Sequence, residues 1–219
     1  MTEAVARQGE LGELERAVRA EIGVDHTAAT NTGVSNPKLA IWLFLSSEAL
    51  FFGAFIATYF LYRGRDPQFL GGPTPHDLLN IPFTSVTSFV LLMSSLTMVL
   101  ALAAIQRGDM RRLRIWLLAT AFFGLLFVGG QVFEFTEFYR EGLSLHSNLF
   151  GTTFFTLTGL HGAHVTAGII WLLLLWGRAV QGKLGPENHE AIEIAGLYWH
   201  FVDVVWIIIF TAIYLIPAH

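Results

Sequence analysis

The sequence predicts an all-α, polytopic membrane protein, a bundle of five transmembrane helices with its N-terminus in the cytoplasm and its C-terminus outside. Three observations predict this fold class. Of the 219 residues, 53% are hydrophobic and only 14% are charged, whereas an average soluble domain has about 25% charged residues. Five apolar windows are long enough to cross a bilayer, which takes roughly 20 residues. Lysine and arginine are concentrated in alternate connections between these windows.

The predicted spans cover residues 39–62, 82–106, 113–139, 149–177 and 191–216. All seven prolines lie at the ends of these windows or between them, where a missing backbone N–H is least costly. We therefore expect one transmembrane domain over residues 39–217, preceded by a cytoplasmic tail of residues 1–38.

The N-terminal tail has one pattern of its own. Four apolar residues, Leu11, Leu14, Val18 and Ile22, recur at helical spacing among charged ones, which predicts a short amphipathic helix. Its polar face has too little positive charge to favour an anionic membrane surface. Docking on a partner protein and simple disorder are both compatible with this tail.

The orientation follows from the positive charges. Ten of the thirteen lysines and arginines lie in the N-terminal tail and in the second and fourth connections, and the other three lie in the first and third. Because short cytoplasmic segments retain positive charge, the N-terminus is predicted to be cytoplasmic. The net charge is only -4, without any basic run, so no nucleic-acid partner is expected. The absence of cysteine excludes disulfides, thiolate-held metals and cysteine nucleophiles.

Glu48 lies near the middle of the first span, where a charged acid costs at least ~2.5 kcal/mol. It therefore needs a partner or a proton. Binding of a lipid headgroup or support of proton uptake is the functional interpretation, and a protonated acid at a helix contact is the structural one. The adjacent face carries Ala49, Gly53 and Ala57, a small-residue pattern that lets helices approach closely. This pattern predicts that Glu48 faces protein rather than lipid.

The fourth span carries His161 and His164, which lie on one helical face at i, i+3. Two imidazoles can take part in a metal site, but only Glu48 and His200 are at a comparable depth to complete it. Hydrogen bonding between helices is therefore favoured, and no metal site is predicted. A second small-residue stripe on this span, Gly159, Ala163 and Ala167, predicts close packing.

Three further buried polar residues are predicted in the third and fifth spans. Glu134 lies towards the end of the third span, where solvation and burial are equally compatible with the sequence. In the fifth span, His200 and Asp203 at i, i+3 can form a hydrogen-bonded or ionic pair, which lowers the cost of burying both. Together with His161 and His164, these residues form a predicted buried polar cluster with a structural role.

At these residues the sequence resembles subunit III of the haem-copper terminal oxidases. The segment YWHFVDVVW at residues 198–206 is similar to a signature of that family. Supporting segments are SEALFF at 47–52, QVFE at 131–134, TGLHGAHV at 158–165, and Asn188-His189 with Glu193. Many relatives have two adjacent histidines where this chain has Asn188 and His189.

The resemblance implies a non-catalytic subunit in the inner membrane of a bacterium. Such a subunit has no haem, copper or catalytic residue of its own, because haem and copper lie in the partner subunits. It packs mainly on subunit I, beside subunit II and a small subunit IV, and supports proton uptake and stability during aerobic electron transport. It also holds phospholipid in a cleft between helices. By position, Glu48 corresponds to the acid of that cleft, and we group Arg178 with it. His161, His164, His200 and Asp203 correspond to buried polar positions of the family.

Two features leave the oxidase type open. Longer family members have seven helices, so one wall of the cleft is expected to be missing here or supplied by another chain. The SEALFF segment resembles the group that oxidises cytochrome c, whereas the short length and the Gly71-Gly72-Pro73-Thr74 loop resemble the quinol group. We expect a cytochrome c oxidase subunit, with a quinol oxidase subunit as the alternative. An independent proton or cation transporter and an intramembrane metalloenzyme are the further alternatives.

Overall fold

The computed structural model describes residues 35–63, 80–146 and 149–216, and these residues are helical apart from short turns. The long helices are α2 (Asn36–Arg63), α4 (Ile81–Gln106), α5 (Met110–Arg140), α6 (Leu149–Val180) and α7 (His189–Phe210). A 3-10 turn, η2 (Pro186–Asn188), precedes α7, and a π-helical turn, η3 (Thr211–Leu215), follows it. Five helices in the described ranges are long and apolar enough to cross a membrane, and no strand occurs there, which confirms the predicted fold class.

The chain divides into two compact units, residues 1–43 and 44–219, with the boundary inside α2. Of the first unit, the structure describes residues 35–43, which include the first turns of α2. The predicted amphipathic helix of the N-terminal tail and the Gly71-Gly72-Pro73-Thr74 loop lie outside the described residues. The orientation of the termini stays a prediction.

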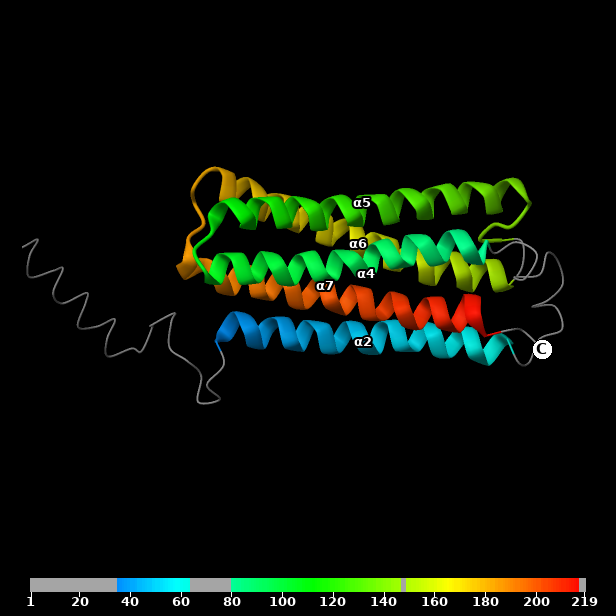
Figure 1. Cartoon of the computed structure of the whole chain (residues 1–219). Coiled ribbons are helices and arrows are strands. Elements are labelled where there is room, and N and C mark those ends of the chain that lie inside the picture. Colours follow the sequence, from blue (N-terminus) through cyan, green and yellow to red (C-terminus); the bar gives the residue numbers. More distant parts are fainter. Residues whose placement is uncertain (1–34, 64–79, 147–148, 217–219) are drawn as a thin grey trace, which may run out of the picture. The chain divides into compact units, whose positions relative to one another are not determined.

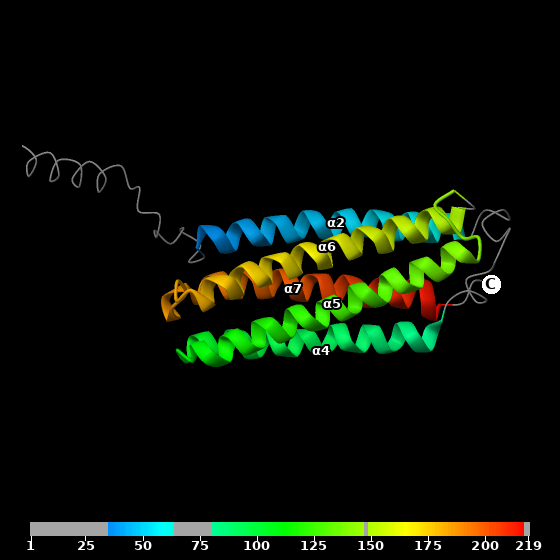
Figure 2. The ribbon, with the colours of Figure 1, turned by 90° about the horizontal axis from the view of Figure 1, so that it is seen from above.

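Four helices of the second unit pack in a ring. Helix α4 packs on α5 and α7, and α6 packs on the same two helices (Figure 1). The view turned by 90° shows α5 crossing over α7 between α4 and α6 (Figure 2). The interior of this ring is filled by large side chains that are almost completely buried, among them Leu91, Met98, Leu113, Leu117, Phe127, Phe154 and Trp199. Because apolar packing holds these four helices together, they form the scaffold for the polar groups described below.

From Phe44 onwards, α2 contacts the bundle through a narrow stripe of side chains. Leu45, Phe52 and Tyr59 are buried and recur every seven residues, the spacing of one helical seam. The Phe52 ring lies 5.0 Å from the imidazole of His164, and the Tyr59 ring lies 6.5 Å from Phe150. Most of the other side chains of α2 are exposed, as Leu50 shows with 77% of its surface accessible.

The turn between α4 and α5 is built by local hydrogen bonds. Gly108 adopts φ +74°, a left-handed conformation that glycine tolerates without strain. The Gly108 and Asp109 N–H groups donate to the carbonyls of Ile105 and Ala104, which closes the end of α4. Asp109 then caps α5, because its side chain accepts a hydrogen bond from Arg112 N at 3.0 Å. As a result α5 begins at Met110, three residues before the predicted start.

The other four helices also differ slightly from the predicted bounds, and α2 and α4 start three residues and one residue earlier than predicted. Helix α6 continues to Val180, so Arg178 lies in its last turn. Helix α7 starts at His189, two residues earlier than predicted, directly after the turn at Pro186–Asn188. Its last residues form the π-helical turn, which includes the buried Tyr214.

No other helix of the described residues packs closely on the small-residue stripes, so their predicted close packing stays a prediction. The α2 stripe, Ala49, Gly53 and Ala57, is exposed, and so are Ala163 and Ala167 of the α6 stripe. A Cβ atom added at Gly53 or at Gly159 would have nothing within 4 Å. Spacing alone shows that small residues share a face, but it does not show whether another helix of the same chain covers that face.

The close approaches occur instead at Gly124 on α5 and Gly168 on α6. A Cβ atom at Gly124 would lie 2.7 Å from Trp199 Cη2, and one at Gly168 would lie 2.9 Å from Trp199 Cε3. The Trp199 indole of α7 therefore fills the space between α5 and α6. Both glycines are buried, and Trp199 is 1% exposed.

Candidate functional site

A partly buried polar pair joins Glu48 of α2 to His164 of α6. Glu48 Oε2 lies 3.2 Å from His164 Nε2, and the two side chains are 18% and 21% exposed. Glu48 therefore faces protein, as predicted. It lies on the side of α2 that carries the buried Phe52, whereas the small-residue stripe lies on the exposed side.

The second ring nitrogen of His164 fixes what this pair can do chemically. His164 Nδ1 lies 2.8 Å from the Leu160 carbonyl oxygen, an acceptor, so Nδ1 carries a hydrogen. A neutral imidazole then has a lone pair at Nε2, and only a protonated Glu48 can donate to it. A doubly protonated imidazole instead donates to the Glu48 carboxylate. In either of these two states one proton bridges Glu48 and His164, so the geometry allows the pair to share a proton at the edge of the bundle.

Glu134 of α5 is buried and forms a hydrogen-bonded network across three elements. It is 6% exposed. The Thr84 hydroxyl of α4 donates to Glu134 Oε1, and the Tyr214 hydroxyl of η3 donates to Oε2 at 3.3 Å. By contrast, Glu137 lies one turn further along α5 and pairs with the exposed Arg140 at 3.0 Å. Of the two alternatives left open for Glu134, the structure therefore shows the buried one, whereas the Glu137 side chain is exposed.

Two serines of α4 receive the indole N–H groups of α7. Trp199 Nε1 donates to Ser94 Oγ, and Trp206 Nε1 donates to Ser88 Oγ, each at 2.8 Å. Each serine also donates to a carbonyl of its own helix, Ser94 to Leu91 and Ser88 to Thr84. Each serine hydroxyl thus accepts from an indole and donates to a carbonyl, so both buried indole N–H groups are satisfied. The two bonds connect α4 to α7 at two positions along the helices.

The predicted pair between His200 and Asp203 is wrong. His200 Nδ1 lies 2.5 Å from Ser95 Oγ, so this imidazole is bound to α4 and not to its own helix. Asp203 is 3% exposed, and although the Ser95 hydroxyl lies close to it, neither carboxylate oxygen forms a hydrogen bond of good geometry among the described residues. The i, i+3 spacing allows the pair, but the His200 imidazole is hydrogen-bonded to the Ser95 hydroxyl on the facing helix instead.

The two histidines of α6 have different surroundings. His164 makes the predicted hydrogen bond between helices, whereas for His161 that prediction is wrong. Neither ring nitrogen of the fully buried His161 has a hydrogen-bond partner among the residues that the structure describes. Its ring stacks on Trp206, with centroids 4.9 Å apart, and meets the Phe127 ring edge-on at 5.8 Å. His161 is therefore held by aromatic packing.

The remaining predicted site residue, Arg178, is exposed in the last turn of α6. It lies about four turns, or about 21 Å, along α6 from His164. The structure therefore does not bring Arg178 to the Glu48 pair. Within the described residues, no three histidine, aspartate or glutamate side chains converge as they would around a metal ion.

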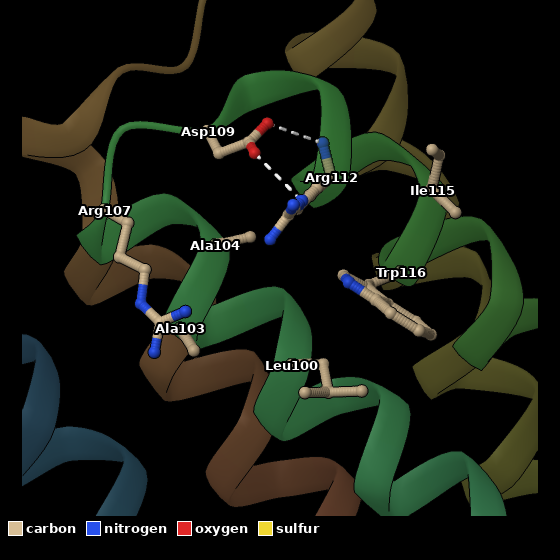
Figure 3. A pocket seen from close by; sticks show the side chains of 8 residues that line it. All are labelled: Leu100, Ala103, Ala104, Arg107, Asp109, Arg112, Ile115 and Trp116. Carbon is tan, nitrogen blue, oxygen red and sulfur yellow. Dashed lines mark hydrogen bonds and ion pairs between the residues drawn. The ribbon is translucent and has the colours of Figure 1, made fainter.

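Sequence reasoning missed the hydroxyls of α4 and the indoles of α7. Thr84, Ser88, Ser94 and Ser95 are polar residues inside an apolar span, and Trp199 and Trp206 are seven residues apart on α7. This combination is a detectable signal, because hydroxyls in a membrane bundle usually bond across helices. A cavity at the α4–α5 turn, which contains Arg107 and Arg112, was also missed (Figure 3). The sequence shows these arginines only as positive charges that predict orientation, and their spacing does not reveal a shared cavity.

Comparison with known proteins gives a coherent result. Residues 15–217 match the family described as "Cytochrome c oxidase subunit III". Cytochrome c oxidase subunit 3 of Bacillus sp. (strain PS3) is 37% identical over 180 residues, which cover 82% of this chain and 86% of that protein. Quinol oxidase subunit 3 of Bacillus spizizenii is 38% identical over 177 residues, covering 81% and 85%. Cytochrome bo(3) ubiquinol oxidase subunit 3 of Pseudomonas aeruginosa is 34% identical over 198 residues, covering 90% and 93%.

Proposed function

Because the chain belongs to the cytochrome c oxidase subunit III family, and so is a subunit of a haem-copper terminal oxidase in the bacterial inner membrane, we propose a specific role for it there. It is the non-catalytic subunit that packs on subunit I of an oxidase fed by cytochrome c. It holds phospholipid and supports proton uptake by its partner.

The observation that carries the proposed role in proton uptake is the Glu48–His164 pair. Glu134 is enclosed by Thr84 and Tyr214, which join three elements of the bundle. The Glu48–His164 pair instead has a geometry that can share one proton between its two side chains, and about a fifth of each side chain is exposed. An intramembrane acid in that state can exchange a proton with a neighbouring group or bind a polar headgroup.

Packing on a partner subunit is supported by the exposed faces of α2 and α6. The α2 stripe of Ala49, Gly53 and Ala57 is exposed, with nothing within 4 Å of a Cβ at Gly53. In a bilayer, small residues let the backbone of a second helix approach closely. The exposed apolar side chains beside the α2 seam, such as Leu50 and Phe51, offer lipid chains a surface next to Glu48.

The pair is tested in the intact oxidase with Glu48→Gln, and with Glu137→Gln as the matched control. Both changes remove a carboxylate from a membrane helix, but within the described ranges the Glu137 carboxylate contacts only the exposed Arg140. We expect both variants to assemble and only Glu48→Gln to turn over more slowly at high pH or to lose activity sooner during turnover. Unchanged kinetics and lifetime for Glu48→Gln would contradict the role of the pair.

The electron donor is the second point to test, because the relatives include proteins named for cytochrome c and proteins named for quinol. A complex purified through a tag on this chain should show a haem spectrum and oxidise reduced cytochrome c. Oxidation of a quinol without any activity on cytochrome c would instead assign the subunit to a quinol oxidase. Purification of the chain without a haem-containing partner would contradict the proposal as a whole.

A further inference from the structure

A cavity of about 410 Å³ lies at the turn between α4 and α5. Its walls come from the last turns of α4 and the first turns of α5, and they combine two arginines with apolar side chains (Figure 3). It uses none of the residues of the Glu48–His164 pair. We propose that this cavity binds the phosphate group of an anionic phospholipid.

The charges of the cavity favour an anion. The Arg107 side chain is exposed and makes no hydrogen bond or ion pair among the described residues, whereas its backbone N–H donates to Ala103 O. Arg112 is held by Asp109, whose Oδ2 lies 3.2 Å from Arg112 Nε, and the Arg112 side chain is 69% exposed. Because this contact uses Nε, the two terminal amino groups of Arg112 stay available as donors. Two guanidinium groups against one carboxylate leave the cavity with one net positive charge.

The contact with Asp109 also positions Arg112. Asp109 caps α5 through Arg112 N at 3.0 Å, so the same carboxylate fixes the backbone and the side chain of this residue. Figure 3 shows the Arg112 guanidinium directed into the space between the two helices, with Arg107 and Trp116 also bordering that space. A guanidinium held in this way loses less conformational freedom when it binds a phosphate oxygen.

The position of the cavity selects a lipid over a soluble ion. It lies where α4 ends and α5 begins, at one end of two membrane spans, which is the level of the lipid headgroups. Trp116 also lines it, and tryptophan is typical of the membrane interface. The indole N–H of Trp116 has no hydrogen-bond partner in the described part of the chain, so it is free to donate to a headgroup oxygen.

An apolar surface continues from the cavity towards the membrane interior. On α4, Leu100 and Leu96 lie about two and three turns below Arg107 on the same face, and Leu96 is 54% exposed. On α5, Ile115 and Phe122 follow Arg112 on its face, and each is 55% exposed. Acyl chains can cover this strip while the phosphate meets the arginines.

The test measures lipid binding to the delipidated full-length chain in detergent, by native mass spectrometry. The probes are phosphatidylglycerol, phosphatidylcholine and glycerol phosphate. The key variant is Arg107→Gln/Arg112→Gln, and Arg111→Gln is the matched control, since Arg111 is an exposed arginine of the same turn that does not line the cavity. We expect the double variant to bind phosphatidylglycerol at least about tenfold more weakly, from the loss of charge-assisted hydrogen bonds. Arg111→Gln should bind like the unaltered chain, and phosphatidylcholine should bind more weakly than phosphatidylglycerol.

A second readout does not depend on the arginine variants. Phosphatidylglycerol with brominated acyl chains should quench the fluorescence of the unaltered chain more than that of Trp116→Phe. Equal retention of phosphatidylglycerol by the double variant, or an equal loss in Arg111→Gln, would overturn the proposal. Displacement of the lipid by glycerol phosphate would overturn it in favour of a soluble phosphate ester. Because this assay needs neither the oxidase partners nor turnover, its outcome is independent of the proposed role in the oxidase.

Discussion

The packing of Trp199 between α5 and α6 can be tested by adding one methyl group. In Gly124→Ala, the new Cβ atom would lie 2.7 Å from Trp199 Cη2 and 3.0 Å from Ile169 Cγ1. Carbon atoms in favourable contact are about 3.5–4.0 Å apart, so the indole or the helix must shift by roughly 1 Å. The indole cannot move freely, because its N–H is bound to Ser94 at 2.8 Å.

The magnitude follows from comparing Gly124→Ala with Gly129→Ala on the same helix. Overpacking of this kind costs about 1–3 kcal/mol. Alanine also gains up to about 1 kcal/mol over glycine in a helix interior, and both variants have that gain. Gly129 has nothing within 4 Å of an added Cβ atom. The free energy of unfolding should therefore be about 1–3 kcal/mol lower for Gly124→Ala than for Gly129→Ala, because the helix propensity cancels.

The assay is reversible unfolding of the full-length chain in mixed detergent micelles, followed by tryptophan fluorescence. Neither variant removes a tryptophan, so the signal is comparable. The pair Gly168→Ala and Gly177→Ala repeats the comparison on α6, where only Gly168 faces Trp199. Equal unfolding midpoints for Gly124→Ala and Gly129→Ala would refute the close packing of α5 on Trp199.

Two hydrogen-bonded contacts give further predictions. In a double-mutant cycle of Ser88→Ala and Trp206→Phe, the coupling energy from unfolding should be about 0.6–1.7 kcal/mol, the range for hydrogen bonds inside membrane bundles. Additive effects of the two changes would show that the indole N–H does not depend on this serine. Glu134→Leu should lower the unfolding free energy by about 1–3 kcal/mol, because it leaves the buried hydroxyls of Thr84 and Tyr214 without their acceptor. Glu137→Leu, at an exposed ion pair, should cost less than about 1 kcal/mol, and an equal loss in both would contradict the buried network.

The membrane spans follow from the sequence for a simple physical reason. A bilayer has a fixed thickness and leaves no backbone hydrogen bond unpaired, so each crossing needs about 20 apolar residues in a helix. The ends of the helices are nearly as local. Gly108 and Asp109 close α4 and cap α5 through bonds to residues within five positions, and those residues are visible in the sequence.

The partners of the buried polar residues are not local. Ser95 meets His200 across 105 positions, and Glu48 meets His164 across 116. Helical spacing brought His200 and Asp203 to one region, but it could not show that a hydroxyl of α4 would take the imidazole. For the same reason, helical spacing could not show that the fully buried His161 would lie among aromatic rings. It also could not show that the small-residue stripe of α2 would face away from the other helices of the chain.

The sequence by itself determined that this chain crosses a membrane five times, which residue types lie inside, and which family it resembles. Each of these depends on composition and on patterns within one helix or one short segment. Only the tertiary structure decided which inside residues meet, because that depends on how α4, α5, α6 and α7 rotate and pack against each other. The choice of Ser88 and Ser94 for the indoles, and of His164 for Glu48, is a result of that packing.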